Sequence, residues 1–173
     1  MIDLSLRIDN RSRILGLVCQ NPGIHLRELQ RSLGVSFNAI RYNTEKMSHS
    51  GEIACEKSSG YTRFYPPDIS ERDRMVYSLS RNSTTFKIML ELGTSGQLTN
   101  KELAERTGFA KSTISEHVHE LMGANLVRLT LSEEGNFKVE FQNKEQIQLI
   151  ICNIQQANQK KDVVENFANL WDF

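Results

Sequence analysis

The apolar positions along this chain follow one pattern that occurs twice, with an offset of 74 residues between the copies. Under that shift Gly34 aligns with Gly108, and Ile40 aligns with Ile114. An internal repeat of this length indicates two copies of one structural unit. The two copies cover residues 8–67 and 83–142.

Within each copy the spacing of apolar residues predicts three helices, the last two joined by a tight turn. Gly34 and Gly108 fall at that turn, because the end of a helix favours glycine. Thr99, with Glu102 three residues later, fits a helix start with a capping box, whereas Ala110 is a weak start for the last helix of copy two. The two helices beside the turn are expected at 26–33 and 37–49, and again at 100–107 and 111–123.

Two short runs of alternating apolar and polar residues follow the helices in each copy. Segments that contain glycine separate the runs, which is typical of β-hairpins. A helix-turn-helix followed by a hairpin is a winged helix. We therefore predict a mostly α fold with small β-hairpin wings, in the α+β class. The expected strands cover residues 52–56, 61–65, 126–131 and 137–141.

Two further helical segments lie outside the copies. Ser70 and Asp73 have the spacing of a helix start, which predicts a connector helix over 71–81. Apolar residues recur at steps of three or four in the tail, so we expect one long helix over 144–171. The predicted domains are a first winged helix at 1–69, the connector at 70–82, a second winged helix at 83–142 and the C-terminal helix at 143–173.

The stretch 99–121, TNKELAERTGFAKSTISEHVHEL, resembles the winged helix-turn-helix of the MarR and ArsR regulator families. Copy one resembles it more weakly, through 35–42 and 51–53. The whole arrangement is similar to the tandem winged-helix regulators that are common in archaea. This resemblance implies DNA binding and transcriptional regulation, whereas the apolar periodicity indicates only the architecture.

The charge of the chain limits how it could bind nucleic acid. Lys plus Arg and Asp plus Glu each total 21 among 173 residues, so the formal net charge is zero. This balance argues against coating of nucleic acid by bulk positive charge. The charge is uneven: residues 1–69 hold nine basic and seven acidic side chains, net +2, and the segments 70–142 and 143–173 are each net −1. We therefore expect contact with DNA to depend on a few placed cations.

Several other classes of protein are not indicated. No apolar stretch approaches 18 residues, and the N-terminus lacks the pattern of a secretion signal, so no membrane partner is expected. Cys19, Cys55 and Cys152 are far apart, which fits a reducing cytoplasm. The sequence contains no glycine-rich phosphate loop, nucleophile motif or paired metal ligands, so we expect no enzyme, cofactor or metal site.

The last helix of each copy is the candidate for reading DNA. One face of each helix is apolar, and the other carries short donors and cations suited to base edges and phosphates. Asn38 suits adenine and Arg41 suits guanine, while an ordinary solvated helix face is the alternative interpretation. The candidate DNA-binding residues on these helices are Ser36, Asn38, Arg41, Tyr42 and Lys46 in copy one, and Lys111, Ser112, Thr113, Ser115 and His119 in copy two.

The two predicted wings differ in charge. Lys57 and Arg63 in the first wing can contact the DNA backbone, whereas phosphates would repel Glu133 and Glu134 at the tip of the second. Copy one has the better electrostatics and copy two the better helix-turn-helix sequence, so either copy could dominate DNA contact. His117 lies beside the apolar row of its helix and is expected to be structural.

The apolar stripe of the long tail helix indicates a partner, because one small winged helix cannot bury it. We expect a homodimer through this helix, with folding back over its own chain as the alternative. The candidate dimerisation residues are Ile147, Ile150, Ile154, Val164, Phe167 and Trp171.

Together these features predict a transcriptional regulator that reads double-stranded DNA as a homodimer. The alternative function is a winged-helix module for protein–protein assembly that does not read DNA sequence. The operator, activator or repressor action, and any small-molecule effector cannot be read from the sequence.

Overall fold

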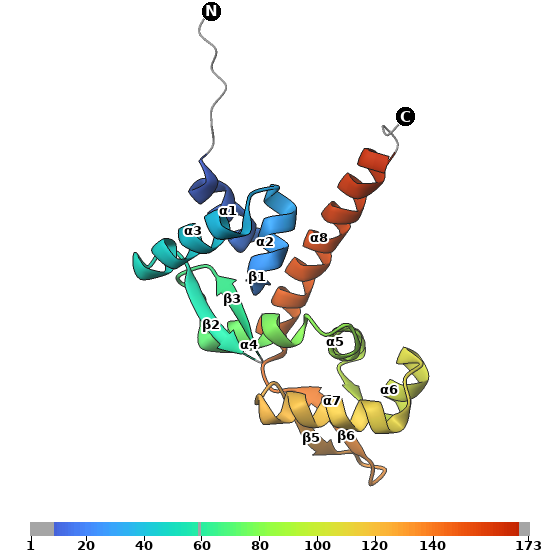
Figure 1. Ribbon diagram of the computed structural model, residues 1–173. Helices are drawn as coiled ribbons and strands as arrows, with labels where there is room; N and C mark the ends of the chain where they lie inside the picture. The colour runs from blue at the N-terminus through green and yellow to red at the C-terminus, as the bar shows by residue number, and fades with distance from the viewer. Residues whose placement is uncertain (1–8, 59, 170–173) are drawn as a thin grey trace, which may run out of the picture. The chain divides into compact units, whose positions relative to one another are not determined.

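A computed structural model describes residues 9–58 and 60–169 (Figure 1), with side chains described as far as residue 159 except for Ser58. The chain divides between Ser70 and Glu71 into two compact units, here called the first and the second unit. Each unit contains a helix-turn-helix and a hairpin, as the repeat predicts.

The first unit packs three helices against a small antiparallel sheet. The sheet has the strand order β1-β3-β2, with Phe64 of the central strand opposite Ile24 on one side and Cys55 on the other. Ile14, Ile24, Ile40 and Phe64 belong to its buried core, which draws on both the helices and the sheet. Its elements are α1 (Asn10–Gln20), β1 (Ile24–His25), α2 (Leu26–Leu33), α3 (Phe37–His49), β2 (Ala54–Ser58) and β3 (Tyr61–Tyr65).

Local capping fixes where the two helices of the first turn begin and end. The imidazole of His25 accepts a hydrogen bond from the Glu28 amide, and the Glu28 carboxylate accepts one from the His25 amide, which makes a reciprocal capping box. Gly34 ends α2 with φ of 64°, in the left-handed region that glycine adopts without strain. The Ser36 hydroxyl then accepts from the Ala39 amide and starts α3.

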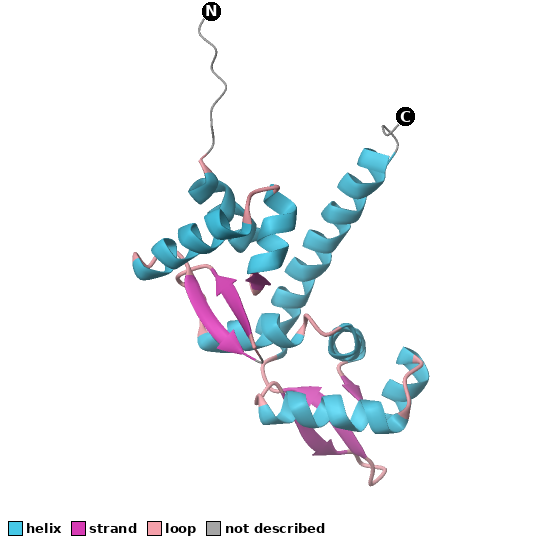
Figure 2. Ribbon diagram, viewed as in Figure 1, coloured by secondary structure: helices cyan, strands magenta, loops and turns pink. Residues whose placement is uncertain are grey.

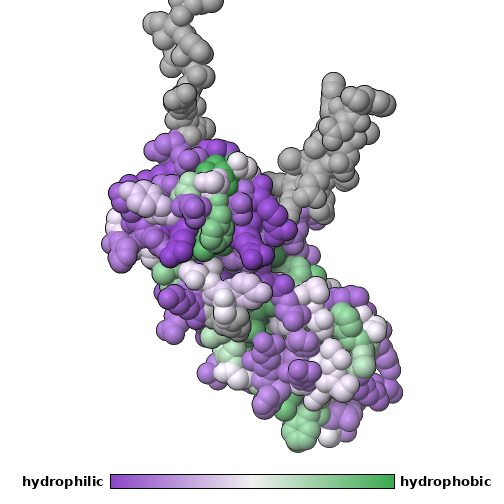
Figure 3. All heavy atoms as spheres, viewed as in Figure 1, coloured by the Kyte–Doolittle hydropathy of each residue, from purple (hydrophilic) through white to green (hydrophobic). Residues whose placement is uncertain are grey.

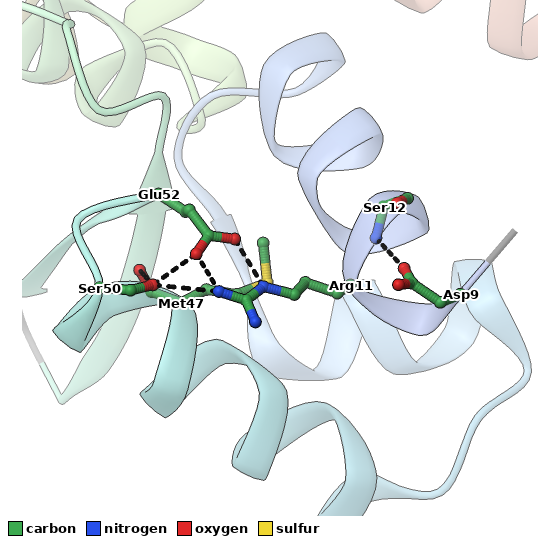
Figure 4. A network of polar contacts seen from close by, with 6 residues as sticks. All are labelled: Asp9, Arg11, Ser12, Met47, Ser50 and Glu52. Atoms are coloured by element: carbon green, nitrogen blue, oxygen red, sulfur yellow. Dashed lines mark hydrogen bonds and ion pairs between the residues drawn. The ribbon is translucent and has the colours of Figure 1, made fainter.

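A polar network joins the start of α1 to the turn after α3 (Figure 4). The guanidinium of Arg11 donates through Nε to Glu52 Oε2 at 2.6 Å and through Nη2 to Oε1. The hydroxyl of Ser50 lies 2.6 Å from Glu52 Oε1 and completes the cluster. These hydrogen bonds, first from Arg11 and then from Ser50, lower the pKa of Glu52 to about 2. The network stabilises the turn that leads into the hairpin.

The second unit repeats this arrangement and adds a helix at each end (Figure 2). Its sheet has the order β4-β6-β5, with Val139 of the central strand opposite Leu98 and Leu129. Its elements are α4 (Glu71–Leu79), α5 (Ser83–Ser95), β4 (Gln97–Leu98), α6 (Asn100–Thr107), α7 (Lys111–Gly123), β5 (Val127–Leu131), β6 (Phe137–Phe141) and α8 (Lys144–Asn169).

The connector helix α4 and the first turns of α8 pack into the core of the second unit. Val76 on α4 and Ile147 on α8 are both buried in that core. Side-chain amides hold α8 in place, because Gln146 Nε2 donates to Asp73 Oδ1 and Gln148 Nε2 donates to the Gly93 carbonyl, each at 2.6 Å. The beginning of the tail helix is therefore part of the second unit.

The fold class and the helices beside both turns are confirmed at the predicted positions. The first wing strand begins at Ala54 and not at residue 52. The prediction was wrong there because the amides of Glu52 and Ile53 donate to the carbonyl of Met47 and form a turn. The connector helix is shorter than predicted and ends at Leu79. The sequence prediction also missed β1 and β4, which add a third strand to each sheet.

Candidate nucleic-acid interface

The recognition helix of the first unit, α3, divides into a buried and an exposed face. Ile40, Thr44 and Met47 are almost completely buried, which confirms the predicted core row. The candidate DNA-binding residues Ser36, Asn38, Arg41, Tyr42 and Lys46 are all exposed. Their side chains are therefore available to a ligand in the isolated unit.

Two contacts between neighbouring side chains order this exposed face. Arg41 Nε donates to Glu45 Oε1 at 2.9 Å, and this bond raises the pKa of the Arg41 guanidinium. Lys46 Nζ lies 4.7 Å from the centre of the Tyr42 ring, within the range of a cation–π contact. Because Glu45 occupies Arg41, a base or phosphate must compete with that carboxylate for the guanidinium.

The two basic residues of wing 1, the β2–β3 hairpin, have different surroundings. Lys57 is exposed and has no ion-pair partner among the described residues. Arg63 is partly buried, and its Nη1 donates to the Gly23 carbonyl at 3.1 Å. Lys57 is thus free to meet a phosphate, whereas Arg63 stabilises the turn before β1.

The recognition helix of the second unit, α7, exposes Lys111, Ser112, Ser115 and His119, while Thr113 is partly exposed. Its core row of Ile114, Val118 and Leu121 is buried. Ala110 stands at the N-cap and makes no side-chain cap, as expected from its methyl group.

A buried polar contact ties α7 to α5. Nδ1 of His117 lies 3.0 Å from the hydroxyl of Thr85, which is fully buried. The same nitrogen lies 3.3 Å from Glu120 Oε2. The structural role predicted for His117 is confirmed, because the imidazole links two helices of the second unit.

Wing 2, the β5–β6 hairpin, is acidic and apolar on its outside. Arg128 Nε donates to Glu140 Oε1 at 2.7 Å, and this bond, followed by one from Gln97, lowers the pKa of Glu140. Glu133 and Glu134 are exposed at its tip.

Hydrophilic side chains cover most of the visible face of each unit (Figure 3). Wing 2 nevertheless exposes three large apolar side chains, Leu129 (45%), Leu131 (66%) and Phe137 (64%).

The candidate dimerisation residues on α8 fall into two groups. Ile147 and Ile150 are buried in the core of the second unit, and Ile154 is partly buried against it. These side chains therefore contribute to their own unit. Val164 and Phe167 lie in the helix, but their side chains lie outside the described residues, as does the whole of Trp171.

Two cations outside the predicted set lie on α2. Arg27 and Arg31 are exposed, four residues apart, and make no ion pair in the described part of the chain. Two arginines one helical turn apart are a signal in the sequence, and the predicted DNA-binding set does not include them.

No three His, Cys, Asp or Glu side chains gather to hold an ion among the residues whose side chains are described, 9–57 and 60–159. None of the helices described is long and apolar enough to cross a membrane.

Comparison with known proteins supports both units. A family model described as an N-terminal HTH domain matches residues 8–77, and one described as winged helix-turn-helix DNA-binding matches residues 81–128. An uncharacterized HTH-type transcriptional regulator from Methanocaldococcus jannaschii is 24% identical over 136 residues, which is 79% of this chain and 34% of that protein. The chain thus spans about a third of the length of this relative.

One solved structure shares a partial likeness with the chain. The protein comes from Corynebacterium diphtheriae and is 17% identical, with a TM-score of 0.32, over 76% of this chain and 26% of that one. The fold and the two family matches define a chain with two helix-turn-helix domains in tandem, the second a winged helix of DNA-binding type. The predicted resemblance to tandem winged-helix regulators is confirmed, and the matching relative comes from an archaeon.

Proposed function

We propose that the chain is a transcriptional regulator that binds double-stranded DNA through α3 and α7. The observation that carries this proposal is the exposed polar face on the last helix of both helix-turn-helix motifs. The match of residues 81–128 to a DNA-binding family model supports it, as does the name of the archaeal relative, an HTH-type transcriptional regulator.

The first unit supplies the stronger contacts in this proposal. Asn38 and Arg41 on α3 reach base edges, while Lys46 and Lys57 bind phosphates. On binding DNA, Arg41 releases its hydrogen bond to Glu45 and donates two hydrogen bonds to a guanine, one to O6 and one to N7. The second unit adds shorter donors and cations that position α7 in a groove, namely Lys111, Ser112, Thr113, Ser115 and His119.

We also propose that the distal part of α8 forms a homodimer. The early apolar residues of this helix are buried in their own unit, so a partner would contact the turns that contain Val164 and Phe167. A two-fold dimer would place equivalent recognition helices on half-sites about 34 Å apart, or a multiple of that distance. Palindromic operators are the expected consequence.

Binding of the full chain to labelled duplexes tests the DNA proposal. Fluorescence anisotropy at low salt with a random-sequence duplex should show binding that weakens steeply as salt rises. Selection from a random pool should then yield a preferred site. The absence of any duplex binding at low salt would contradict the proposal.

A second candidate function is protein contact through the second unit. The exposed apolar side chains of wing 2, together with its acidic tip, favour this role over contact with phosphates. Glu133→Lys with Glu134→Lys separates the two roles. A strong gain in duplex affinity would mean that wing 2 lies near DNA, and unchanged affinity would favour protein contact.

A further inference from the structure

A groove of about 940 Å³ opens on the first unit between α2, the start of α3 and the tip of wing 1. The exposed face of α3 that carries Asn38 and Arg41 does not line it. The groove therefore adjoins the surface proposed to read duplex DNA but does not include its base-reading residues. Its walls are made by aromatic and basic side chains, chiefly His25, Arg27, Gln30, Arg31, Phe37 and Tyr61.

The basic side of the groove is a pair of arginines. Arg27 and Arg31 are exposed one helical turn apart on α2, and no carboxylate lines the groove. Like charges at this spacing destabilise a helix. In the second copy the equivalent residues are Lys101 and Glu105, whose charged groups lie 3.9 Å apart. Only the first unit thus keeps two positive charges at these positions, which an anion would satisfy.

The aromatic side of the groove presents flat surfaces to solvent. The rings of His25 and Tyr61 are stacked, with centroids 5.8 Å apart and planes inclined by 24°. Tyr61 is 58% exposed, so its other side is open, and Phe37 is 39% exposed. The His25 ring is fixed by its capping bond to the Glu28 amide. A fixed ring beneath Tyr61 makes a rigid platform.

We propose that this groove binds an unstacked nucleotide, with its base stacked on Tyr61 and its phosphate held by Arg27 and Arg31. Aromatic side chains beside cations bind single-stranded nucleic acid in this way, because each base has a flat face that can stack and each backbone phosphate carries a negative charge. The nucleotide can come from a single strand, such as locally opened DNA, or from a free mononucleotide. The proposal goes beyond duplex binding and stands independently of it.

Fluorescence anisotropy of the full chain with a labelled single strand of twelve thymidines tests the stacking. Tyr61→Ala should weaken binding by about 5- to 150-fold, the range for loss of one stacked base, while Tyr61→Phe should keep it. The matched control is Phe137→Ala, an equally exposed aromatic that begins β6 as Tyr61 begins β3. Circular dichroism checks that each variant is folded.

A second variant tests the charges independently of the ring. Arg27→Gln with Arg31→Gln should reduce the slope of log affinity against log salt for the single strand by about 0.7, because the two arginines hold one phosphate. Calorimetry with AMP identifies the source of the nucleotide. Binding of AMP that is lost in Tyr61→Ala would indicate a free nucleotide, and binding of the strand alone would indicate nucleic acid.

The groove proposal is overturned if neither the strand nor AMP binds, or if Tyr61→Ala and Phe137→Ala weaken binding equally. Duplex affinity measured on the same wild-type sample keeps the two proposals apart. If the wild-type chain binds duplex but neither the strand nor AMP, the groove proposal is rejected and duplex recognition stands. If it binds the strand or AMP but no duplex, duplex recognition is rejected and the groove proposal stands.

Discussion

Arg11 on α1 holds the carboxylate of Glu52 through two hydrogen bonds, and the equivalent residues of the second copy, Thr85 and Leu126, are both buried. The same point of the repeat is thus a polar contact in one unit and part of the core in the other. Because the Arg11–Glu52 contact is partly exposed, its strength depends on solvent conditions.

The low pKa of Glu52 predicts how this contact responds to acid. A carboxyl with a lowered folded-state pKa stabilises the fold above its ordinary pKa of 4.5, and this contribution is lost as pH falls towards about 2. Glu52→Gln should therefore lower the melting temperature by a few degrees at pH 6 and hardly at all near pH 2. Thermal melts across this range measure the difference.

Glu56→Gln on β2 is the control, because Glu56 is exposed and its carboxylate makes no ion pair in the described part of the chain. Its effect should not follow the same pH course. A Glu52→Gln difference that stays constant from pH 6 to pH 2 would show that the carboxylate does not carry the effect.

We predict that position 108 requires glycine because of its left-handed backbone conformation, and not because neighbouring atoms leave no room for a side chain. Its φ is 76°, and a Cβ added there would meet nothing within 4 Å. Gly108→Ala should cost about 1 kcal/mol of unfolding free energy, from left-handed strain alone. Urea unfolding measures this loss. Gly123→Ala is the matched control, since Gly123 has equal room and no positive φ, and it should be neutral or stabilising.

The two basic residues of wing 1 should respond oppositely to substitution. Lys57→Ala should weaken duplex binding evenly across sequences and reduce the salt slope by about 1, because its proposed role is a phosphate contact. Arg63→Ala should instead lower stability, since its guanidinium holds the Gly23 carbonyl. Anisotropy titrations and melting curves on both variants separate the effects. Equal losses of affinity at unchanged stability would contradict this division.

The proposed dimer makes a prediction about α8. Phe167→Glu should convert a dimer to a monomer in light scattering, because a charge in an apolar interface is costly. Leu149→Glu is the control, since Leu149 is exposed on the first turns of the helix. A monomeric wild-type chain at tens of micromolar would contradict the dimer.

Much of the fold was predictable because its signals are local. Glycines at the C-caps and apolar spacing gave both helices of each turn, from Leu26 and from Asn100 onward. The two-residue strands β1 and β4 were missed because two residues cannot show an alternating pattern. Pairing with β3 and β6 creates them, and that depends on tertiary structure.

The candidate site was less predictable, because exposure and pairing depend on neighbours distant in sequence. No local pattern indicates that Arg63 turns towards Gly23, or that Tyr61 stacks on His25 across the sheet. The apolar row of α8 likewise looked like one continuous stripe. Its first residues, such as Ile147, are covered by their own unit.

We propose above that the exposed face of α3 reads duplex DNA. The most direct test compares wild type and Arg41→Ala on the selected duplex and on variants with one base pair changed. Arg41→Ala should lose about 1–3 kcal/mol of binding free energy on the selected site and should discriminate less at one base pair. A wild-type chain with no preference among these duplexes, or an Arg41→Ala variant with unchanged specificity, would contradict it.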